Sequence, residues 1–116
     1  MILEKQNICI LIPVLNEAYN IEELCLRLFE SLENFNYIIA FIDDGSTDGT
    51  VEYIKSLNSK HVLLLERRKT EKGCQRGGAL YYGLKEISKT YKIDYWVEID
   101  GDLSHQPEEI LPALKI

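Results

Sequence analysis

Two aspartates separated by a single glycine, Asp100 and Asp102, directly follow an apolar segment at residues 93–99. That segment reads as a strand mostly buried in a sheet, and side chains two apart on an extended chain point the same way. The two carboxylates can therefore converge on one hard cation, Mg²⁺ or Mn²⁺, which completes its shell with water and phosphate oxygens. The Asp-Gly-Asp pattern indicates a metal site beside a diphosphate, although a solvated loop is the usual meaning of so short a motif.

The segment "DDGSTDGT" at residues 43–50 is a second polar cluster, and it also follows an apolar run. Its glycines permit tight turns, and Ser46 or Asp48 suits the cap of the next helix. Capping does not explain the adjacent Asp43 and Asp44, because two such carboxylates repel each other unless they meet donors such as a ribose, a base amide or a basic side chain. We therefore favour a ligand-binding interpretation for this pair.

The segment "PVLNE" at residues 13–17 follows the first apolar run. Pro and Asn are common in turns, and Glu suits the positive first turn of a helix. By itself this segment therefore predicts only a turn and a helix start.

The segment "ERRKTEKGCQRGG" at residues 66–78 is the one basic concentration in a chain whose formal net charge is -6. An exposed charged loop and a phosphate-contacting segment explain it equally well, so both interpretations stay open. Its cations are Arg67, Arg68, Lys69, Lys72 and Arg76.

Apolar runs with strand character alternate with helical patterns along the chain. This alternation predicts an α/β fold with a mainly parallel sheet and helices on both of its faces. Such sheets bind ligands at the carboxyl ends of their strands, which is where the polar segments fall. The predicted strands are 7–12, 37–42, 62–65 and 95–99, and the predicted helices are 20–33, 51–57, 79–87 and a fourth that begins at Pro107.

The helix at residues 20–33 has the clearest signals, because its apolar residues recur at helical spacing. Asn20 is its predicted N-cap, and Glu23 three residues later completes a capping box. In the fourth helix Pro107 suits the first position, whereas Pro112 would remove one backbone bond and kink or stop the helix.

The composition is that of a globular protein of one domain, with 116 residues of which 46% are hydrophobic and 28% charged. The acidic net charge argues against general nucleic-acid binding, which needs Lys and Arg to neutralise phosphates. No apolar run approaches the roughly 20 residues of a membrane-spanning helix, and the first residues lack a signal-peptide pattern, so we expect a cytoplasmic location. Cys9, Cys25 and Cys74 lack CxxC spacing and are expected to be reduced, the first two in the core.

Taken together, "IPVLNEAYNIEEL", "FIDDGSTDGT" and "EIDGDLSHQPEEI" resemble, in this order, the family 2 glycosyltransferases of the GT-A fold. The likeness is greatest to the dolichyl-phosphate mannose synthase type and related polyprenyl-phosphate glycosyltransferases. The three segments cover the chain nearly end to end, and their order and spacing make the match specific. The resemblance implies that residues 1–116 are the Rossmann-like, N-terminal nucleotide-sugar-binding part of a GT-A domain. Family domains continue for about as long again, so we expect the chain to be truncated.

The resemblance also implies a role for each polar cluster. The segment after the first strand lines the nucleotide site, the acidic pair after the second strand holds the base and ribose, and Asp100 and Asp102 form the DxD site for Mg²⁺ or Mn²⁺. The implied donor-binding residues are Pro13, Asn16, Glu17, Asp43, Asp44, Gly45, Arg76 and Ser104, with Asp100 and Asp102 as the catalytic metal ligands.

Some positions depart from the family pattern. Gln75 and Arg76 stand in the glycine-rich segment "GCQRGGALYYG" where family members usually have small or apolar residues. Glu98 adds an acid to a strand that is usually apolar at that point. The part of the family domain that would follow supplies the acceptor contacts, further basic residues and any general base.

The implied chemistry is inverting transfer of a sugar from GDP-mannose or a UDP-sugar to a polyprenyl phosphate or a glycan acceptor. The metal would neutralise the charge that develops on the nucleoside-diphosphate leaving group. A lipid phosphate is already anionic and needs little base assistance, whereas a hydroxyl acceptor needs a base that these residues do not identify. A lipid acceptor would bring the protein to the inner face of a membrane, and an uncovered sheet edge makes self-association a further hypothesis.

Two alternatives stay open on the sequence alone. One is a nucleotide- and metal-binding fragment without turnover, because the acceptor half is missing. The other is an acid-cluster phosphohydrolase or receiver-like domain in which Asp43 would be phosphorylated, and which would need a Lys and a Ser or Thr on later strands.

Overall fold

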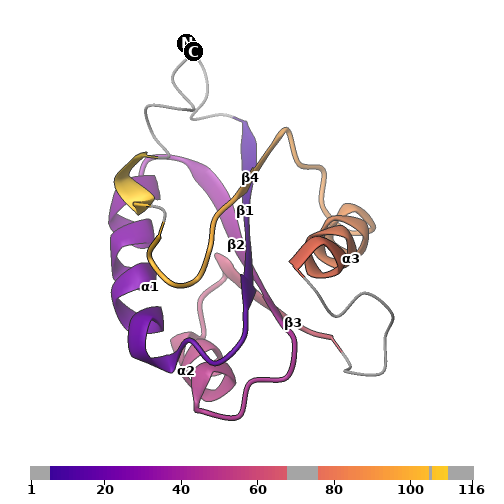
Figure 1. Cartoon of the computed structure of the whole chain (residues 1–116). Coiled ribbons are helices and arrows are strands. Elements are labelled where there is room, and N and C mark those ends of the chain that lie inside the picture. Colours follow the sequence, from indigo (N-terminus) through magenta and orange to yellow (C-terminus); the bar gives the residue numbers. More distant parts are fainter. Residues whose placement is uncertain (1–5, 68–75, 105, 110–116) are drawn as a thin grey trace.

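A computed structural model describes residues 6–67, 76–104 and 106–109, and of these the side chains of 76, 77 and 109 are left undescribed. Strands and helices alternate along the described chain (Figure 1). The elements are β1 (Asn7–Val14), α1 (Ala18–Leu32), β2 (Asn36–Asp43), α2 (Thr50–Leu57), β3 (Val62–Glu66), α3 (Arg76–Ser88), β4 (Tyr95–Glu98) and a single 3₁₀ turn, η2 (Pro107–Glu109).

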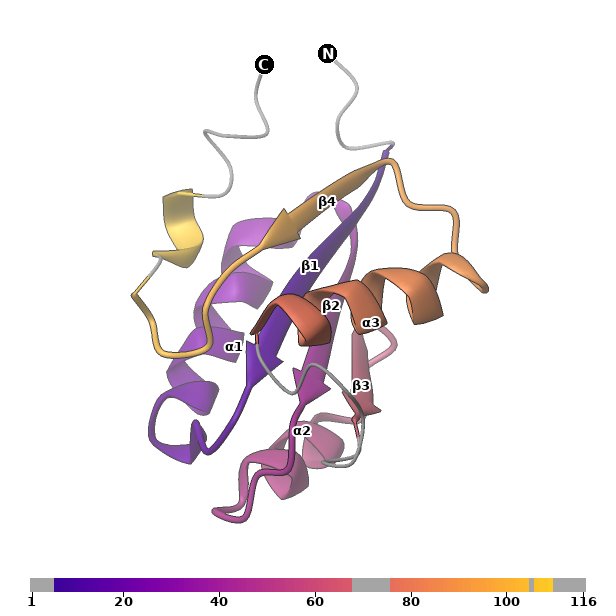
Figure 2. The same cartoon turned by 45° about the vertical axis from the view of Figure 1, so that its right-hand side comes forward.

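The strands form one parallel sheet in the order β3-β2-β1-β4. The central strand β1 pairs with β2 from Asn7 and Asn36 to Val14 and Asp43, and it pairs with the shorter β4 on its other side. Figure 2 shows the arrowheads of β1, β2 and β3 pointing to the same end of the sheet. The predicted α/β fold with a parallel sheet is confirmed.

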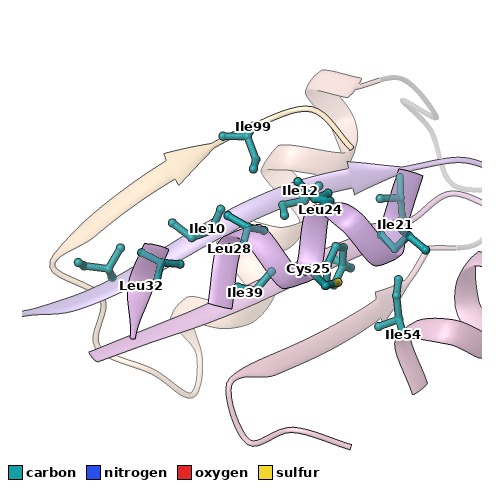
Figure 3. Close-up of a cluster of buried hydrophobic side chains, with 13 residues drawn as sticks. Ile10, Ile12, Ile21, Leu24, Cys25, Leu28, Leu32, Ile39, Ile54 and Ile99 are labelled. Carbon is teal, nitrogen blue, oxygen red and sulfur yellow. The ribbon is translucent and has the colours of Figure 1, made fainter. Parts of the chain in front are cut away.

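Alternate side chains of β1 enter two separate cores, because successive strand residues point to opposite faces. On one face Ile10 and Ile12 pack with Leu24 and Leu28 of α1, and Ile54 of α2 joins the same core (Figure 3). On the other face Cys9, Leu11, Ala40 and Ile42 pack against Ala79 and Ile87 of α3. Helices therefore cover both faces of the sheet, as predicted.

The helix α1 begins two residues earlier than predicted, and the predicted capping box is wrong. Glu17 is the N-cap, it makes no side-chain capping bond, and Asn20 lies inside the first turn with its Nδ2 3.4 Å from Glu17 Oε1. The backbone amides at this end are satisfied instead by distant side chains, those of Asp48 in the loop after β2 and Thr50 at the start of α2. A local cap is unnecessary because a long-range one replaces it.

The strand before the Asp-Gly-Asp motif is less buried than predicted. β4 is an edge strand of the described sheet, with Tyr95 and Glu98 exposed, and burial returns only at Ile99. Of the predicted fourth helix the structure describes one 3₁₀ turn that begins at Pro107, while residues 110–116 lie outside the described chain.

Cys9 and Cys25 are free thiols in the core, as predicted, whereas Cys74 lies outside the described residues. Loss of hydration on burial raises the pKa of each of these two thiols to about 12. Among the described residues, no helix is long and apolar enough to cross a membrane.

Candidate functional site

The loops that carry the predicted residues meet at the carboxyl end of the sheet. Pro13 lies near the end of β1, Asp43 is the last residue of β2, and Asp100 follows β4 by two residues. Parallel strands present their carboxyl ends at one edge, which is the place where open α/β sheets bind ligands. The topology therefore brings three segments, far apart in sequence, to one edge of the sheet.

Asn16 ties the loop after β1 to the loop after β2. Its backbone N–H donates to Ser46 Oγ at 2.8 Å, and its side-chain Oδ1 accepts from the Thr47 backbone N–H at 2.8 Å. The residue adopts a left-handed backbone with φ of 56°, which Asn tolerates better than most side chains do. Asn16 thus connects two of the predicted ligand-binding loops through hydrogen bonds.

Asp48 connects the starts of two helices. Its Oδ2 accepts from the Ala18 backbone N–H of α1 at 3.0 Å, and its Oδ1 accepts from the Thr50 backbone N–H of α2 at 3.1 Å. The Thr50 hydroxyl donates to Asp48 and accepts from the Glu17 N–H at 2.9 Å. The hydrogen bonds that Asp48 accepts, that from the Thr50 hydroxyl first, lower the pKa of its carboxyl group. The sequence predicted Ser46 or Asp48 as the cap of α2, but the N-cap is Gly49, and Asp48 binds the first helical N–H from the position before it. The link to α1 had no local signal in the sequence.

Asp43 is buried at the end of β2, with 3% of its surface exposed. Its Oδ2 accepts from the backbone N–H groups of Gly45 and Ser46, each at 3.0 Å, and its Oδ1 accepts from the Ser46 hydroxyl. Gly45 can fold back in this way because its φ is 110°, a region that favours glycine. The turn itself therefore supplies donors that a buried carboxylate requires.

Asp44 meets a basic side chain that the sequence had placed in the basic segment. Both of its oxygens accept from Arg67, with Nε to Oδ1 at 2.8 Å and Nη2 to Oδ2 at 3.0 Å. The side chains are 14% and 3% exposed, so this is a nearly buried, two-point ion pair. The Arg67 N–H also donates to the Asp43 carbonyl at 2.8 Å. For Arg67 the exposed-loop interpretation is therefore wrong.

The remainder of the basic segment is not placed. Residues 68–75 lie outside the described chain. Arg76 is the first residue of α3, and its side chain is not described. Whether Arg76 faces the other donor-site residues stays a prediction.

Ser104 gathers the two aspartates of the Asp-Gly-Asp motif. Its N–H donates to Asp102 Oδ1 at 2.9 Å, and its hydroxyl donates to Asp100 Oδ2 at 3.1 Å. Asp100 is half-buried and Asp102 is exposed. The structure thus brings together the two predicted metal ligands and Ser104, which was predicted as a donor-binding residue.

Gly101 seats this turn against the loop after β1. A Cβ at this position would lie 3.0 Å from Val14 Cγ1, 3.3 Å from Glu17 Cγ and 3.5 Å from the Pro13 carbonyl oxygen. Because there is no room for a side chain, glycine lets the motif rest directly on two of the predicted nucleotide-site residues.

The donor set fits a hard divalent cation. Two carboxylates and a hydroxyl are oxygen ligands, and Mg²⁺ commonly binds one or two carboxylates and takes its other ligands from water and phosphate. Among the described residues no group of three or more His, Cys, Asp or Glu side chains is arranged for a metal. Such a site would therefore depend on phosphate oxygens of a bound ligand.

Arg27 of α1 is a part of this region that the sequence did not reveal. Its Nε donates to Glu108 Oε2 at 2.8 Å, and its Nη1 donates to Glu23 Oε2 at 3.1 Å, while Nη2 reaches Gln106 and Glu108. The hydrogen bonds that Arg27 donates to Glu108 lower the pKa of Glu108 to about 2 and raise the pKa of Arg27. Only the i,i+4 spacing to Glu23 was visible in the sequence.

Two hollows of the described surface lie away from these loops. One of about 280 Å³ is at the amino ends of the strands, between Tyr37, His61 and Tyr91, and one of about 290 Å³ lies between α3 and β4, at Leu84 and Trp96. Neither contains a predicted site residue. We place the candidate site at the loops instead, because the ligand-capable oxygens converge there and hollow size alone carries no chemistry.

Comparison with known proteins shows which family and which relatives this chain resembles. The model of the family described as "Glycosyl transferase family 2" matches residues 9–116. A dolichol-phosphate mannosyltransferase from Pyrococcus furiosus is 39% identical over 92% of this chain and 28% of its own length. A UDP-N-acetylglucosamine–dolichyl-phosphate N-acetylglucosaminyltransferase from Methanococcus voltae is 31% identical over 90% of this chain and 46% of its own length.

A solved structure shares the fold. The mannosyltransferase from Pyrobaculum calidifontis, in complex with GDP-Man and Mn²⁺, superposes with a TM-score of 0.62 at 23% identity, covering 82% of this chain and 27% of that one. The chain thus spans less than half the length of each of these relatives. Since the family model matches nearly all of the chain, the protein belongs to glycosyl transferase family 2.

Proposed function

We propose that residues 1–116 form the donor-binding part of an inverting glycosyltransferase that moves a sugar from a nucleoside-diphosphate sugar to a polyprenyl phosphate. The observation that carries the proposal is the turn in which Ser104 holds both Asp100 and Asp102, seated at the carboxyl end of the sheet. The relatives add the substrate class, since two of them are named as transferases to dolichyl phosphate or dolichol phosphate. GDP-mannose is the first candidate donor and a UDP-sugar the second.

Each cluster has a place in this proposal. The loops after β1 and β2 receive the base and ribose through Pro13, Asn16, Glu17, Asp43 and Gly45. Asp44 contributes through Arg67, because both of its oxygens are held by that guanidinium. Arg76, at the start of α3, is proposed to approach the donor phosphates.

Asp100, Asp102 and Ser104 would hold Mg²⁺ or Mn²⁺. When bound, the cation offsets the negative charge that develops on the diphosphate leaving group. The turn contributes by presenting two carboxylates in a fixed position, so that little reorganisation is needed as charge develops. A polyprenyl-phosphate acceptor is itself anionic and needs little help from a base, and its lipid would bring the protein to a membrane surface.

Calorimetric titration of the purified chain with GDP and UDP, each with and without Mn²⁺, tests this proposal. We expect Mn²⁺-dependent binding that an Asp100→Asn, Asp102→Asn double variant loses. A Glu30→Gln, Glu33→Gln double variant is the matched control, because it removes the same charge from exposed positions at α1. Nucleotide binding that is the same with and without Mn²⁺, and the same in the Asp100/Asp102 variant, would contradict the metal role. The absence of nucleotide binding to a folded protein would contradict donor binding.

A second candidate is a nucleotide- and metal-binding unit without turnover. It is favoured by the coverage, since the chain spans 28% of the mannosyltransferase relative from Pyrococcus furiosus. Incubation with GDP-mannose and a polyprenyl phosphate separates the two candidates, because only the first forms a glycosylated lipid.

The receiver-like alternative lacks support. Asp43, which would be its phosphorylated residue, is 3% exposed and has both carboxylate oxygens hydrogen-bonded to Gly45 and Ser46. An incoming phosphoryl group needs an accessible oxygen, so this geometry disfavours phosphorylation.

A further inference from the structure

We propose that Arg27 is a positioning residue that fixes the turn at residues 100–104 from outside the site. The proposal rests on the proposed function for what that turn binds. It concerns an α1 side chain that makes none of the suggested ligand contacts itself. Its evidence is a chain of hydrogen bonds that runs from α1 into the turn.

Three nitrogens of the Arg27 guanidinium donate hydrogen bonds to different acceptors. Nε and Nη2 both bind the Glu108 carboxylate, Nη1 binds Glu23 on the same helix, and Nη2 also binds Gln106 Oε1. Gln106 and Glu108 lie just beyond Ser104 in the chain. In Figure 1 the η2 turn lies directly against α1, which agrees with these contacts. A planar fork of donors suits this arrangement in a way that a Lys ammonium cannot reproduce.

Gln106 passes the connection into the turn. While its Oε1 accepts from Arg27, its Nε2 donates to the Leu103 carbonyl at 3.5 Å. Leu103 has a φ of 65°, a left-handed conformation that leucine keeps only when its surroundings hold it. The restraint from Arg27 therefore reaches the residue whose backbone reverses the chain between Asp102 and Ser104.

The segment from Gly101 to Pro107, which includes most of the turn, is anchored at both of its ends. Gly101 packs against Val14 at one end, and Pro107 is fully buried at the other. Arg27 is the charged group that joins the second anchor to α1, with 25% of its side chain exposed. We therefore expect its loss to loosen residues 102–104 rather than to unfold the sheet, because partly exposed ion pairs contribute little to global stability.

Electrostatics alone predicts the opposite effect on a cation. Replacing Arg27 by Met removes a positive charge and leaves Glu23 and Glu108 without that partner, so the local potential becomes more negative. A more negative potential attracts Mn²⁺ more strongly. Weaker Mn²⁺ binding in this variant would therefore come from lost geometry and could not come from the change in charge.

The experiment compares the wild-type chain with Arg27→Met, Arg27→Lys and Lys89→Met. The last variant is the matched control, because it removes one positive charge from a surface ion pair with Glu86. One measurement is the ¹⁵N order parameter of the Ser104 amide, which needs no metal. The other is the Mn²⁺ dissociation constant from electron paramagnetic resonance.

In Arg27→Met we expect the Ser104 order parameter to fall from about 0.85 to below about 0.6. We expect Mn²⁺ binding to weaken by about tenfold, the size of effect seen when groups behind metal ligands are changed. Arg27→Lys should give an intermediate result because it keeps the charge and loses the fork, and Lys89→Met should match wild type.

An unchanged Ser104 order parameter in a folded Arg27→Met chain overturns the proposal, and so does tighter Mn²⁺ binding. If no chain binds Mn²⁺ while the order parameter still falls, Arg27 positions the turn and it is the metal role in the proposed function that fails. The two failures are thereby distinguished.

Discussion

The guanidinium of Arg67 binds both carboxylate oxygens of Asp44, at 2.8 and 3.0 Å, and it is the more buried partner of the pair. It joins the end of β3 to the end of β2 beside Asp43, whose carbonyl accepts from the Arg67 N–H. The acidic pair that stood out in the sequence is therefore divided between two tasks. Asp43 stabilises its own turn, and Asp44 holds the Arg67 guanidinium at the edge where the donor is proposed to bind.

Replacing Arg67 by Met should lower the free energy of unfolding by about 3–5 kcal/mol, because Asp44 would keep a buried charge without its partner. Urea denaturation measures this loss. An Arg67→Met, Asp44→Leu double variant should regain most of it, since neither charge then remains buried. A single variant as stable as wild type would show that the pair is dispensable.

The Asp48 carboxylate should make stability depend on pH. Its folded-state pKa is lowered, so its contribution is complete above the unfolded value of about 3.9 and is lost as the pH falls through the folded value. We expect Asp48→Asn to be less stable than wild type at pH 7, with the difference shrinking as the pH falls below about 4. Thermal unfolding across this range checks it, and a difference that stays constant with pH would contradict the role of the charge.

Gly101→Ala should impair binding more than folding. The added Cβ meets Val14 at 3.0 Å, so the turn must shift by a few tenths of an ångström away from the loop after β1. We expect Mn²⁺-dependent GDP binding to weaken on the order of tenfold.

Gly49→Ala is the matched control for Gly101→Ala. Gly49 has open space around it and a φ of 100°, so an alanine there strains the start of α2 without touching the Asp-Gly-Asp turn. It should reduce stability and leave nucleotide affinity nearly unchanged. Equal effects of the two variants on nucleotide binding would show that the close packing of Gly101 against Val14 has no specific role in binding.

Cys9 and Cys25 should resist thiol reagents in the native chain. With each pKa raised to about 12, roughly one thiol in ten thousand is ionised at pH 8, and both side chains are buried. A Cys74→Ser chain should therefore give no reaction with a disulfide reagent until urea is added, after which two thiols react. Rapid native labelling would mean that the core opens at α1 or β1.

Local patterns in the sequence determined the elements and the edge at which the polar residues gather. Alternating strands and helices predicted the parallel α/β fold, and in such a fold every segment that follows a strand reaches the same edge. The grouping of Asp100, Asp102 and Ser104 was likewise predictable, because these residues are neighbours in the chain and a short turn keeps them together. The family itself was visible in the order of three motifs.

Only the tertiary structure decided which distant groups pair through hydrogen bonds and ion pairs. Asp48 caps α1 from 30 residues away, Arg67 finds Asp44 across 23 residues, and Arg27 finds Glu108 across 81. None of these pairings has a periodic signal, because each depends on the distance between two elements after the sheet has formed. The predicted capping box at Asn20 failed for the same reason: a backbone N–H donates to the nearest well-placed oxygen in space, and in this fold that oxygen belongs to another loop.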